Sequence, residues 1–261
     1  MTYQTLVLER SRPIAYLRLH TPERGNLVDG QTVQELAAAC QQLSDDDAVR
    51  AVILTGEGDA FCRGWDLSGL DPKRESPLAW ARDQGLLGDP FGCLARLPRP
   101  VIAAVNGDAL SAGLELALAC DVRLAAEEAR FACPETGHGL IPWAGGTQRL
   151  PRIVGRSKAL EMILTGEAVD AQGALRTGLV SQVVPSARLL AEAEALAERI
   201  AARGPIAVRY AKEAVNRGLD MTLEQALRYE TDLTIILQTT QDRAEGVRAF
   251  LEKRTPRFKG K

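Results

Sequence analysis

The stretch VIAAVNGDALSAGLELALAC, residues 101–120, decides the fold expected for this chain. Its first five residues form an apolar run typical of a buried strand, a glycine-bearing turn follows, and the apolar segment from Ala112 to Cys120 has helix character. Residues 51–67, AVILTGEGDAFCRGWDL, repeat its skeleton of Gly-Asp-Ala, three residues, Gly, one residue, an acid and Leu. The duplication predicts two copies of one device, a strand and turn followed by a loop or helix start, which presents unpaired backbone N–H groups to a ligand.

Glu115 is the one carboxylate within the apolar segment of the second copy. Burying a charged side chain is unfavourable unless the charge is paired or used in chemistry. A buried ion pair with a distant arginine is one interpretation, although it is the rarer one in so apolar a helix. We therefore take Glu115 as a candidate catalytic residue.

Composition narrows the class of protein. The 261 residues are 46% hydrophobic, enough for a sizeable core, and the net charge of -2 arises from 32 basic and 34 acidic residues. This balance provides no general attraction to nucleic acid or to an anionic membrane. The five cysteines include no C-x-x-C pair, which argues against a disulfide framework or a zinc ribbon. Without an apolar leader or a long apolar run, the chain is expected to be cytoplasmic and to have no membrane contact.

Strand and helix patterns alternate through the first part of the chain and become almost wholly helical from about residue 155. Repeated strand-strand-helix units predict an α/β core over 1–200, and the helical region 201–261 is expected to pack against a partner subunit. The irregular segment 68–97 is typical of an insert that shapes a binding site. The expected elements are a hairpin over 3–20, strands over 50–55, 100–105, 122–125 and 130–132, and helices over 31–43, within 77–94, and over 155–164, 170–176, 187–202, 205–217, 222–238 and 241–253.

Residues 51–67, 102–125 and 131–155 carry a family likeness, the last reading FACPETGHGLIPWAGGTQRLPRIVG. They resemble the enoyl-CoA hydratase/isomerase, or crotonase, superfamily, and the likeness continues through 168–180 to EGVRAFLEKRTPRF at 245–258. The resemblance implies a crotonase-like spiral of repeated ββα units with a C-terminal helical trimerisation region. It also implies assembly as a homotrimer or as a homohexamer, a dimer of trimers.

The same resemblance implies an enoyl-CoA hydratase, a hydro-lyase that adds water across the 2,3 double bond of an acyl-CoA thioester. Coenzyme A is then part of the substrate, and no separate cofactor is expected. The backbone N–H groups of Trp65 and Ala112 match the two family donors that stabilise the negative charge on the thioester oxygen. Taken alone, each glycine-rich turn would more often be structural.

Glu115 and Glu135 match the two family carboxylates that hold the water between them. We assign Glu115 to activating the water and Glu135 to protonating C2. Two close carboxyls in a partly apolar cleft tend to raise the pKa of one of them, so that one can act as acid while the other acts as base. In isolation, Glu135 would be interpreted as a solvated loop acid.

Substrate-binding positions are carried over from the same likeness. Arg24 lies where the family's CoA-contacting loop runs and is a candidate for a phosphate or adenine contact. Phe250 and Lys253 resemble the pair that reaches a neighbouring subunit's CoA, with a solvated basic tail as the alternative. The other expected substrate-binding residues are Asn26, Arg63, Gly64, Asp66, Leu67, Gly113 and Trp143.

Trp65 and Trp143 depart from the family pattern, in which these positions are commonly small. A backbone N–H survives any side chain, so the donor at Trp65 is kept, whereas the two indoles are expected to fill part of the acyl pocket. The hypothesis that follows is a short, branched or cyclic acyl group rather than a long chain.

Asp121 and Arg123 also match the family, and we expect both to be structural. The two histidines, His20 and His138, have no third ligand at metal-binding spacing, so no metal site is expected. For His138, which lies close to Glu135 in sequence, packing is the expected role, and a place in the cleft near Glu135 is the alternative.

Several interpretations stay open. Within the same fold, an isomerase, another acyl-CoA dehydratase or a C–C hydrolase is an alternative to a hydratase. A non-catalytic RNA-binding member is an alternative of another class, against which the lack of a Lys/Arg stripe with interleaved aromatics argues. A dinucleotide-dependent oxidoreductase is suggested by Gly56-Glu57-Gly58 alone, and that motif lacks its third glycine before a helix.

Overall fold

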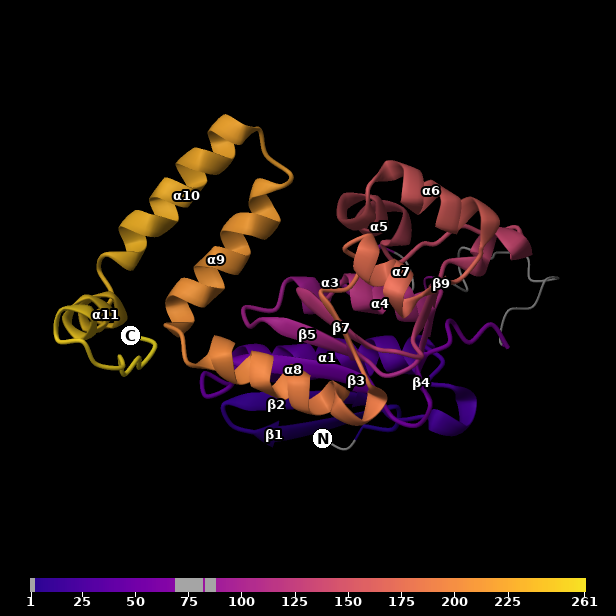
Figure 1. The fold of residues 1–261 in the computed structure, drawn as a ribbon, viewed down its shortest axis with the longest axis horizontal. Coiled ribbons are helices and arrows are strands. Elements are labelled where there is room, and N and C mark those ends of the chain that lie inside the picture. Colours follow the sequence, from indigo (N-terminus) through magenta and orange to yellow (C-terminus); the bar gives the residue numbers. More distant parts are fainter. Residues whose placement is uncertain (1–2, 69–81, 83–87) are drawn as a thin grey trace.

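A six-stranded sheet forms one side of the core in the computed structural model, which describes residues 3–68, 82 and 88–261 (Figure 1). β1 pairs antiparallel with β2, and the remaining neighbours in this sheet run parallel. The strand order is β1 (Leu6–Ser11), β2 (Ile14–Leu19), β3 (Ala51–Gly56), β5 (Val101–Val105), β7 (Val122–Ala126) and β10 (Gln182–Val184). The predicted hairpin and the predicted strands of the core are confirmed.

A second sheet is built from three short strands that follow β3, β5 and β7 along the chain and from a fourth strand later in the chain. Its order is β4 (Ala60–Cys62), β6 (Asp108–Leu110), β8 (Arg130–Ala132) and β9 (Val169–Asp170). The chain therefore passes three times from the first sheet to the second, and after β6 it enters helix α4 (Ala112–Leu118). The passage from β5 through β6 to α4 is one of the ββα units that the sequence predicts.

Helices cover both faces of the six-stranded sheet. β3 and β5 are buried along their whole length, as expected of parallel strands covered on both sides. On one face α8 (Ser186–Ala201) packs Leu189, Ala193 and Ala197 against the sheet. The other face carries the main core and the helices α1 (Gly30–Asp45), α3 (Gly92–Ala95), α4, α5 (Gly146–Val154), α6 (Arg156–Thr165) and α7 (Ala171–Arg176), with short 3-10 turns η1 (Pro22–Arg24) and η2 (Pro134–His138).

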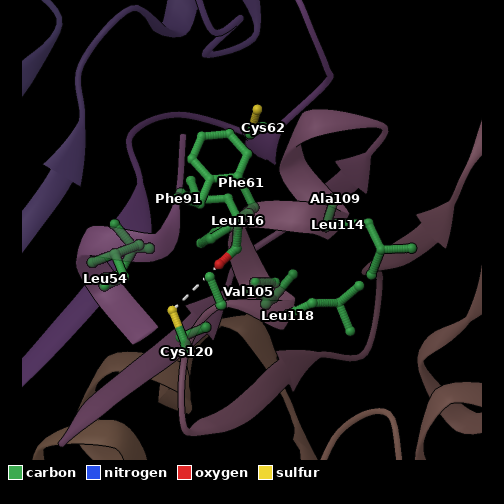
Figure 2. Close-up of a cluster of buried hydrophobic side chains, with 14 of the residues drawn as sticks. Leu54, Phe61, Cys62, Phe91, Val105, Ala109, Leu114, Leu116, Leu118 and Cys120 are labelled. Atoms are coloured by element: carbon green, nitrogen blue, oxygen red, sulfur yellow. Dashed lines mark hydrogen bonds between the residues drawn. The ribbon is translucent and has the colours of Figure 1, made fainter. Parts of the chain in front are cut away.

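Helix α4 lies at the centre of the main core. Every one of its residues is buried, and Figure 2 shows Leu114, Leu116 and Leu118 among the side chains of β3, β4 and β5. The Cys120 thiol, just past the helix, lies 3.5 Å from the Leu116 carbonyl. Because the helix is enclosed on all sides, the carboxyl of Glu115 is carried into the interior with it.

The C-terminal helices form an arm that projects from the core, as Figure 1 shows. α9 (Pro205–Gly218) and α10 (Leu223–Leu237) pack against each other, and α11 (Gln241–Leu251) lies beside the start of α9, where the Phe258 ring is close to both Gly204 and Gly246. α9 buries no residue in the single chain, and Leu223 of α10 is 75% exposed. The helices predicted after residue 200 are confirmed, whereas the division into 1–200 and 201–261 stays a prediction.

Two further expectations from the sequence can be compared with the described residues. The helix expected within 77–94 lies mostly outside them, and the short helix α3 begins only at Gly92. All five cysteines are free thiols, and within the described ranges no helix is long and apolar enough to cross a bilayer.

Candidate active site

The two copies of the repeated motif lie side by side. β4 pairs parallel with β6, which aligns Ala60 with Asp108 and brings the two following loops together. Gly113 sits so close to the Cys62 carbonyl that a Cβ there would overlap it, and a Cβ on Gly64 would lie 3.1 Å from the Cβ of Ser111. Gly64 has φ +131°, a conformation that favours glycine.

The two loops leave the amides of Trp65 and Ala112 unpaired. On either side of Trp65, the Arg63 amide donates to the Gly25 carbonyl at 2.9 Å and the Asp66 amide to the Val28 carbonyl at 2.7 Å. Ala112 is the first residue of α4, so its amide has no partner within the helix. Across the described residues, neither amide has a backbone acceptor. The two expected oxyanion donors are therefore free to bind a ligand oxygen.

Glu115 is fully buried on α4 and is held by one of its two oxygens. Oε1 accepts hydrogen bonds from the backbone amides of Ala144 and Gly146, each at 2.8 Å, whereas Oε2 has no partner among the described residues. Burial raises the pKa of Glu115 to about 7, because it penalises the charged form more than the two amides stabilise it. This pKa suits a group that exchanges protons near neutral pH.

Glu135 faces Glu115 from the turn η2. Its side chain is 4% exposed, and neither carboxylate oxygen has a hydrogen-bond partner among the described residues. The two carboxyls are close enough for the charge of Glu135 to raise the pKa of Glu115, and both charges raise the pKa of the Cys133 thiol between the elements. The structure therefore brings the two sequence-predicted acids together, with three carboxylate oxygens that have no hydrogen-bond partner among the described residues.

Three aromatic rings stack beside the acids. The ring of Trp65 lies 5.1 Å from that of Trp143 and 5.5 Å from that of Phe91, with interplanar angles of 20° and 10°. Trp65 is 7% exposed, and its Nε1 has no partner among the described residues. Both predicted indoles thus lie at the site, and Phe91 is an additional member that sequence reasoning missed.

Backbone and charged groups around Glu115 were also missed. Arg149 donates to the Ala144 carbonyl at 3.0 Å and contacts Asp89 at 2.9 Å, so it ties the segment that binds Glu115 to the start of α3. The signal for these contacts was weak: the run Gly145-Gly146 marks a turn, but nothing in a sequence identifies which amide will meet a carboxylate.

The loop around Arg24 is held by internal contacts. Arg24 is ion-paired with Asp66, and its guanidinium lies 3.8 Å from Asp29. Asn26 is buried, accepts from the Thr21 amide and donates to the Glu57 and Ala60 carbonyls. Asn26 therefore shapes the loop with its polar atoms, whereas the half-exposed Arg24 keeps a surface for a ligand.

The remaining expected substrate positions divide into two places. Arg63 pairs with Asp59 at 3.1 Å, and Leu67 packs against the main core beside the site. Phe250, 82% exposed, lies on α11 and Lys253 just after that helix, and α11 lies away from α4 in the single chain (Figure 1).

Asp121 and Arg123 have the structural roles expected of them. Asp121 accepts from the Val101 amide and from Lys212 Nζ, each at 2.7 Å, and Arg123 donates to the Cys120 and Leu179 carbonyls. The packing role expected for His138 is wrong, because its side chain is exposed at the end of η2. No metal-binding group of His, Cys, Asp and Glu occurs among the described residues.

One known protein family matches the sequence along nearly the whole chain. The model of the family described as enoyl-CoA hydratase/isomerase matches residues 9–261. The chain belongs to this family. The crotonase fold is shared with a solved enoyl-CoA hydratase from Bacillus anthracis, with a TM-score of 0.94 at 40% identity, covering 99% of this chain and 100% of that one.

Two curated members of the enoyl-CoA hydratase/isomerase family show the same coverage. A protein of Mycobacterium bovis named "probable enoyl-CoA hydratase" is 42% identical over 99% of both chains. Crotonyl-CoA hydratase of Syntrophomonas wolfei is 40% identical, again over 99% of both. The family acts on acyl-CoA thioesters, so a substrate of this class is supported.

Proposed function

We propose that this chain is an enoyl-CoA hydratase that adds water across the 2,3 double bond of an enoyl-CoA. The observation that carries the proposal is the buried pair Glu115 and Glu135, which within the described residues leaves three carboxylate oxygens without a partner, beside the amides of Trp65 and Ala112, which have no backbone acceptor there. Buried polar atoms without a partner are costly, and a site that keeps several of them together has a use for them. Hydratases are hydro-lyases, which is the enzyme class of the named relatives.

The reaction balances with these groups alone. Glu115 as carboxylate takes a proton from water through Oε2 while the water oxygen bonds to C3. The electrons of the double bond move toward the thioester oxygen, where the Trp65 and Ala112 amides stabilise the enolate; one such donor is worth about 3 to 4 kcal/mol in other enzymes. Glu135 then gives a proton to C2, and exchange with solvent returns both carboxyls to their starting states.

The stacked rings support a short, branched or cyclic acyl group. Trp65 and Trp143 lie against each other beside the acids, and Phe91 extends the stack. Flat aromatic walls suit a compact or planar acyl group, whereas a long flexible chain would need the space that the indoles occupy. We expect turnover to fall from four- and six-carbon or cyclohexenyl thioesters to ten-carbon ones, and the opposite trend would discard this part of the proposal.

The arm supports assembly as a homotrimer or homohexamer. Its exposed apolar side chains form the kind of surface that a second copy covers: Val215, Leu219, Leu223, Leu227, Ile235, Phe250 and Leu251. In such an assembly Phe250 and Lys253 would reach the CoA bound to a neighbouring subunit, while Arg24 would meet the same CoA from its own chain. A monomeric mass by light scattering at micromolar concentration would contradict this.

We also propose that the reaction needs no cofactor beyond the CoA of the substrate and takes place in the cytoplasm. The residues named above supply every proton transfer, and free thiols are typical of a reducing compartment. Activity that is lost on dialysis against a chelator and restored by a metal would contradict the first statement.

The decisive experiment is a screen of enoyl-CoA thioesters with the purified protein. Hydration is followed as loss of the conjugated enoyl-thioester absorbance, and the products are separated to distinguish a 3-hydroxyacyl thioester from a shifted double bond. Glu115→Gln and Glu135→Gln are the matched variants. A double-bond shift without hydration would favour the isomerase alternative, and full activity in either variant would remove that residue from the mechanism.

A further inference from the structure

Four of the buried side-chain polar atoms without a partner gather at one place. Within the described residues there are five such atoms, and all but Arg99 Nε belong to the site: Trp65 Nε1, Glu115 Oε2 and the two oxygens of Glu135. Three of the four are carboxylate oxygens, which only accept when ionised. The indole N–H of Trp65 is the one donor, and an indole cannot accept.

The ring of Trp65 is held so that this donor stays at the site. It is stacked between Phe91 and Trp143, and its backbone is fixed by the flanking amides of Arg63 and Asp66. The N–H lies outside direct hydrogen-bond geometry to Glu115, yet it is close enough to lower the pKa of that carboxyl. The buried N–H of Trp65 therefore has a specific acceptor nearby, the unpartnered Oε2 of Glu115.

We propose that Trp65 is a positioning residue for Glu115: its indole N–H interacts with the free Oε2, favours the ionised form of this carboxyl and orients it toward the attacking water. The proposal rests on the proposed hydratase function for its catalytic meaning. One residue then acts twice: its amide stabilises the enolate, and its ring supports the base.

The other groups that face Glu115 do not supply this donor. The charge of Glu135 on η2 raises the pKa of Glu115. The charge of Glu115 in turn raises the pKa of the Cys133 thiol, which lies just before η2. Arg149 on α5 is engaged with Asp89 and with the Ala144 carbonyl. In the Trp65 loop, Arg63 contacts Asp59 and Asp108, and Asp66 is paired with Arg24.

A first test uses the pH dependence of turnover. Trp65→Phe keeps an aromatic ring and the backbone amide but removes the indole N–H. We expect the acid limb of kcat/KM to move to higher pH, with about a tenfold loss at pH 6 that shrinks to within about twofold at pH 9, as for loss of a hydrogen bond to a charged group. Trp143→Phe, which changes the same stack, is expected to leave the position of the limb where it is. An equal loss at every pH would overturn the proposal.

A second test reads the contact without any turnover, so it stands even if no enoyl-CoA is hydrated. The chain has three tryptophans, and ¹⁵N-indole labelling gives one cross-peak for each, with Trp65→Phe assigning the peak of Trp65. We expect this peak to shift with pH with a midpoint near 7, the pKa of Glu115. The shift is expected to vanish in Glu115→Gln and to persist, at a lower midpoint, in Glu135→Gln. A pH-independent Trp65 peak in the unmodified protein, or titration that survives Glu115→Gln, would overturn the proposal.

Discussion

The two copies of the Gly-Asp-Ala motif share a sequence skeleton, but the pKa of their acidic residues is shifted in opposite directions. Asp66 of the first copy has a lowered pKa, chiefly because Ser68 donates hydrogen bonds to its carboxylate and also because it is ion-paired with Arg24. Glu115 of the second copy forms no ion pair with any described residue, and burial raises its pKa to about 7. The repeated motif therefore specifies a backbone path, while the surroundings of each acid decide whether it is structural or reactive.

The local structure after the shared glycine explains this divergence. After Gly64 the chain stays extended, and Trp65 bridges to Val28 near the surface loop of Arg24. In the second copy the helix α4 is already under way at Gly113, inside a run of Ala and Leu that favours helix and is buried on every side. An extended segment leaves its acid at the rim, whereas a buried helix carries its acid inward.

The largest difference between the two copies is expected in kcat when the acidic residue of each copy is replaced by its amide. Glu115→Gln is expected to lower kcat at least about 100-fold, because the base that takes the proton from water is gone. Asp66→Asn breaks a partly exposed ion pair and should cost at most about fivefold. Steady-state hydration rates of both variants measure the ratio, and similar losses would mean that the two acids are not distinguished in function.

The pH dependence of stability should differ in sign between the two acids. The carboxyl of Glu115 has an ordinary pKa of 4.5 when unfolded and about 7 when folded. Between these values the folded chain holds a proton that the unfolded chain has released, so the free energy of unfolding falls as pH rises through 7, by on the order of 3 kcal/mol. Asp66, whose pKa is lowered, contributes stability above its ordinary pKa of 3.8 that is lost as pH falls.

Urea unfolding between pH 5 and 8.5 checks this prediction. Glu115→Gln should flatten the loss of stability toward high pH, because the buried charge is no longer formed, whereas Asp66→Asn should leave that slope in place. A slope that is the same in all three proteins would contradict the assignment of the raised pKa.

The shared glycine should be more critical in the second copy. A Cβ in Gly113→Ala would overlap the Cys62 carbonyl, a backbone atom that cannot move alone, and we expect a loss of roughly 2 to 3 kcal/mol. Gly64→Ala meets mainly the strain of its φ of +131°, at about 1 to 2 kcal/mol. Unfolding midpoints of the two variants give the comparison, and a larger loss for Gly64→Ala would reverse it.

The smallest effect expected is that of Asp66→Asn on stability at neutral pH. The partner, Arg24, has a side chain that is 41% exposed, so solvent screens the pair. A loss of about 1 kcal/mol or less is expected. A loss as large as that of Gly113→Ala would show that the Arg24 loop is held mainly by this pair rather than by the buried Asn26.

Much of the fold could be predicted from the sequence because its signals are local. The largely apolar strands Ala51–Gly56 and Val101–Val105 and the periodic helices after residue 155 can each be recognised within a short stretch of sequence. Glu115 could be singled out for a similar reason, since a carboxylate in an apolar run is conspicuous. The pairing of Glu115 with Glu135 was expected from family likeness, because their separation along the chain gives no distance in space.

The contacts that sequence reasoning missed are those made by backbone or by isolated side chains. The amides of Ala144 and Gly146 hold Glu115, yet any residue except proline has such an amide. Phe91 is a single aromatic residue in an irregular segment, so no periodicity indicates where its ring packs. Asn26 follows the motif of a ligand loop but has φ 55° and turns its polar atoms inward, which only the three-dimensional path of the loop determines.

The hydrogen bonds that hold only one of the two carboxylate oxygens of Glu115 have a consequence for the stereochemistry of the product. Two amides hold Oε1, so the carboxylate is prevented from rotating, and Oε2 meets the solvent-derived oxygen from a constant direction. A planar alkene resting under the stacked indoles presents one of its two faces to that direction. The proposed hydration would therefore yield a single enantiomer at C3. If Glu115 were held less firmly, chiral chromatography of the alcohol would show both enantiomers.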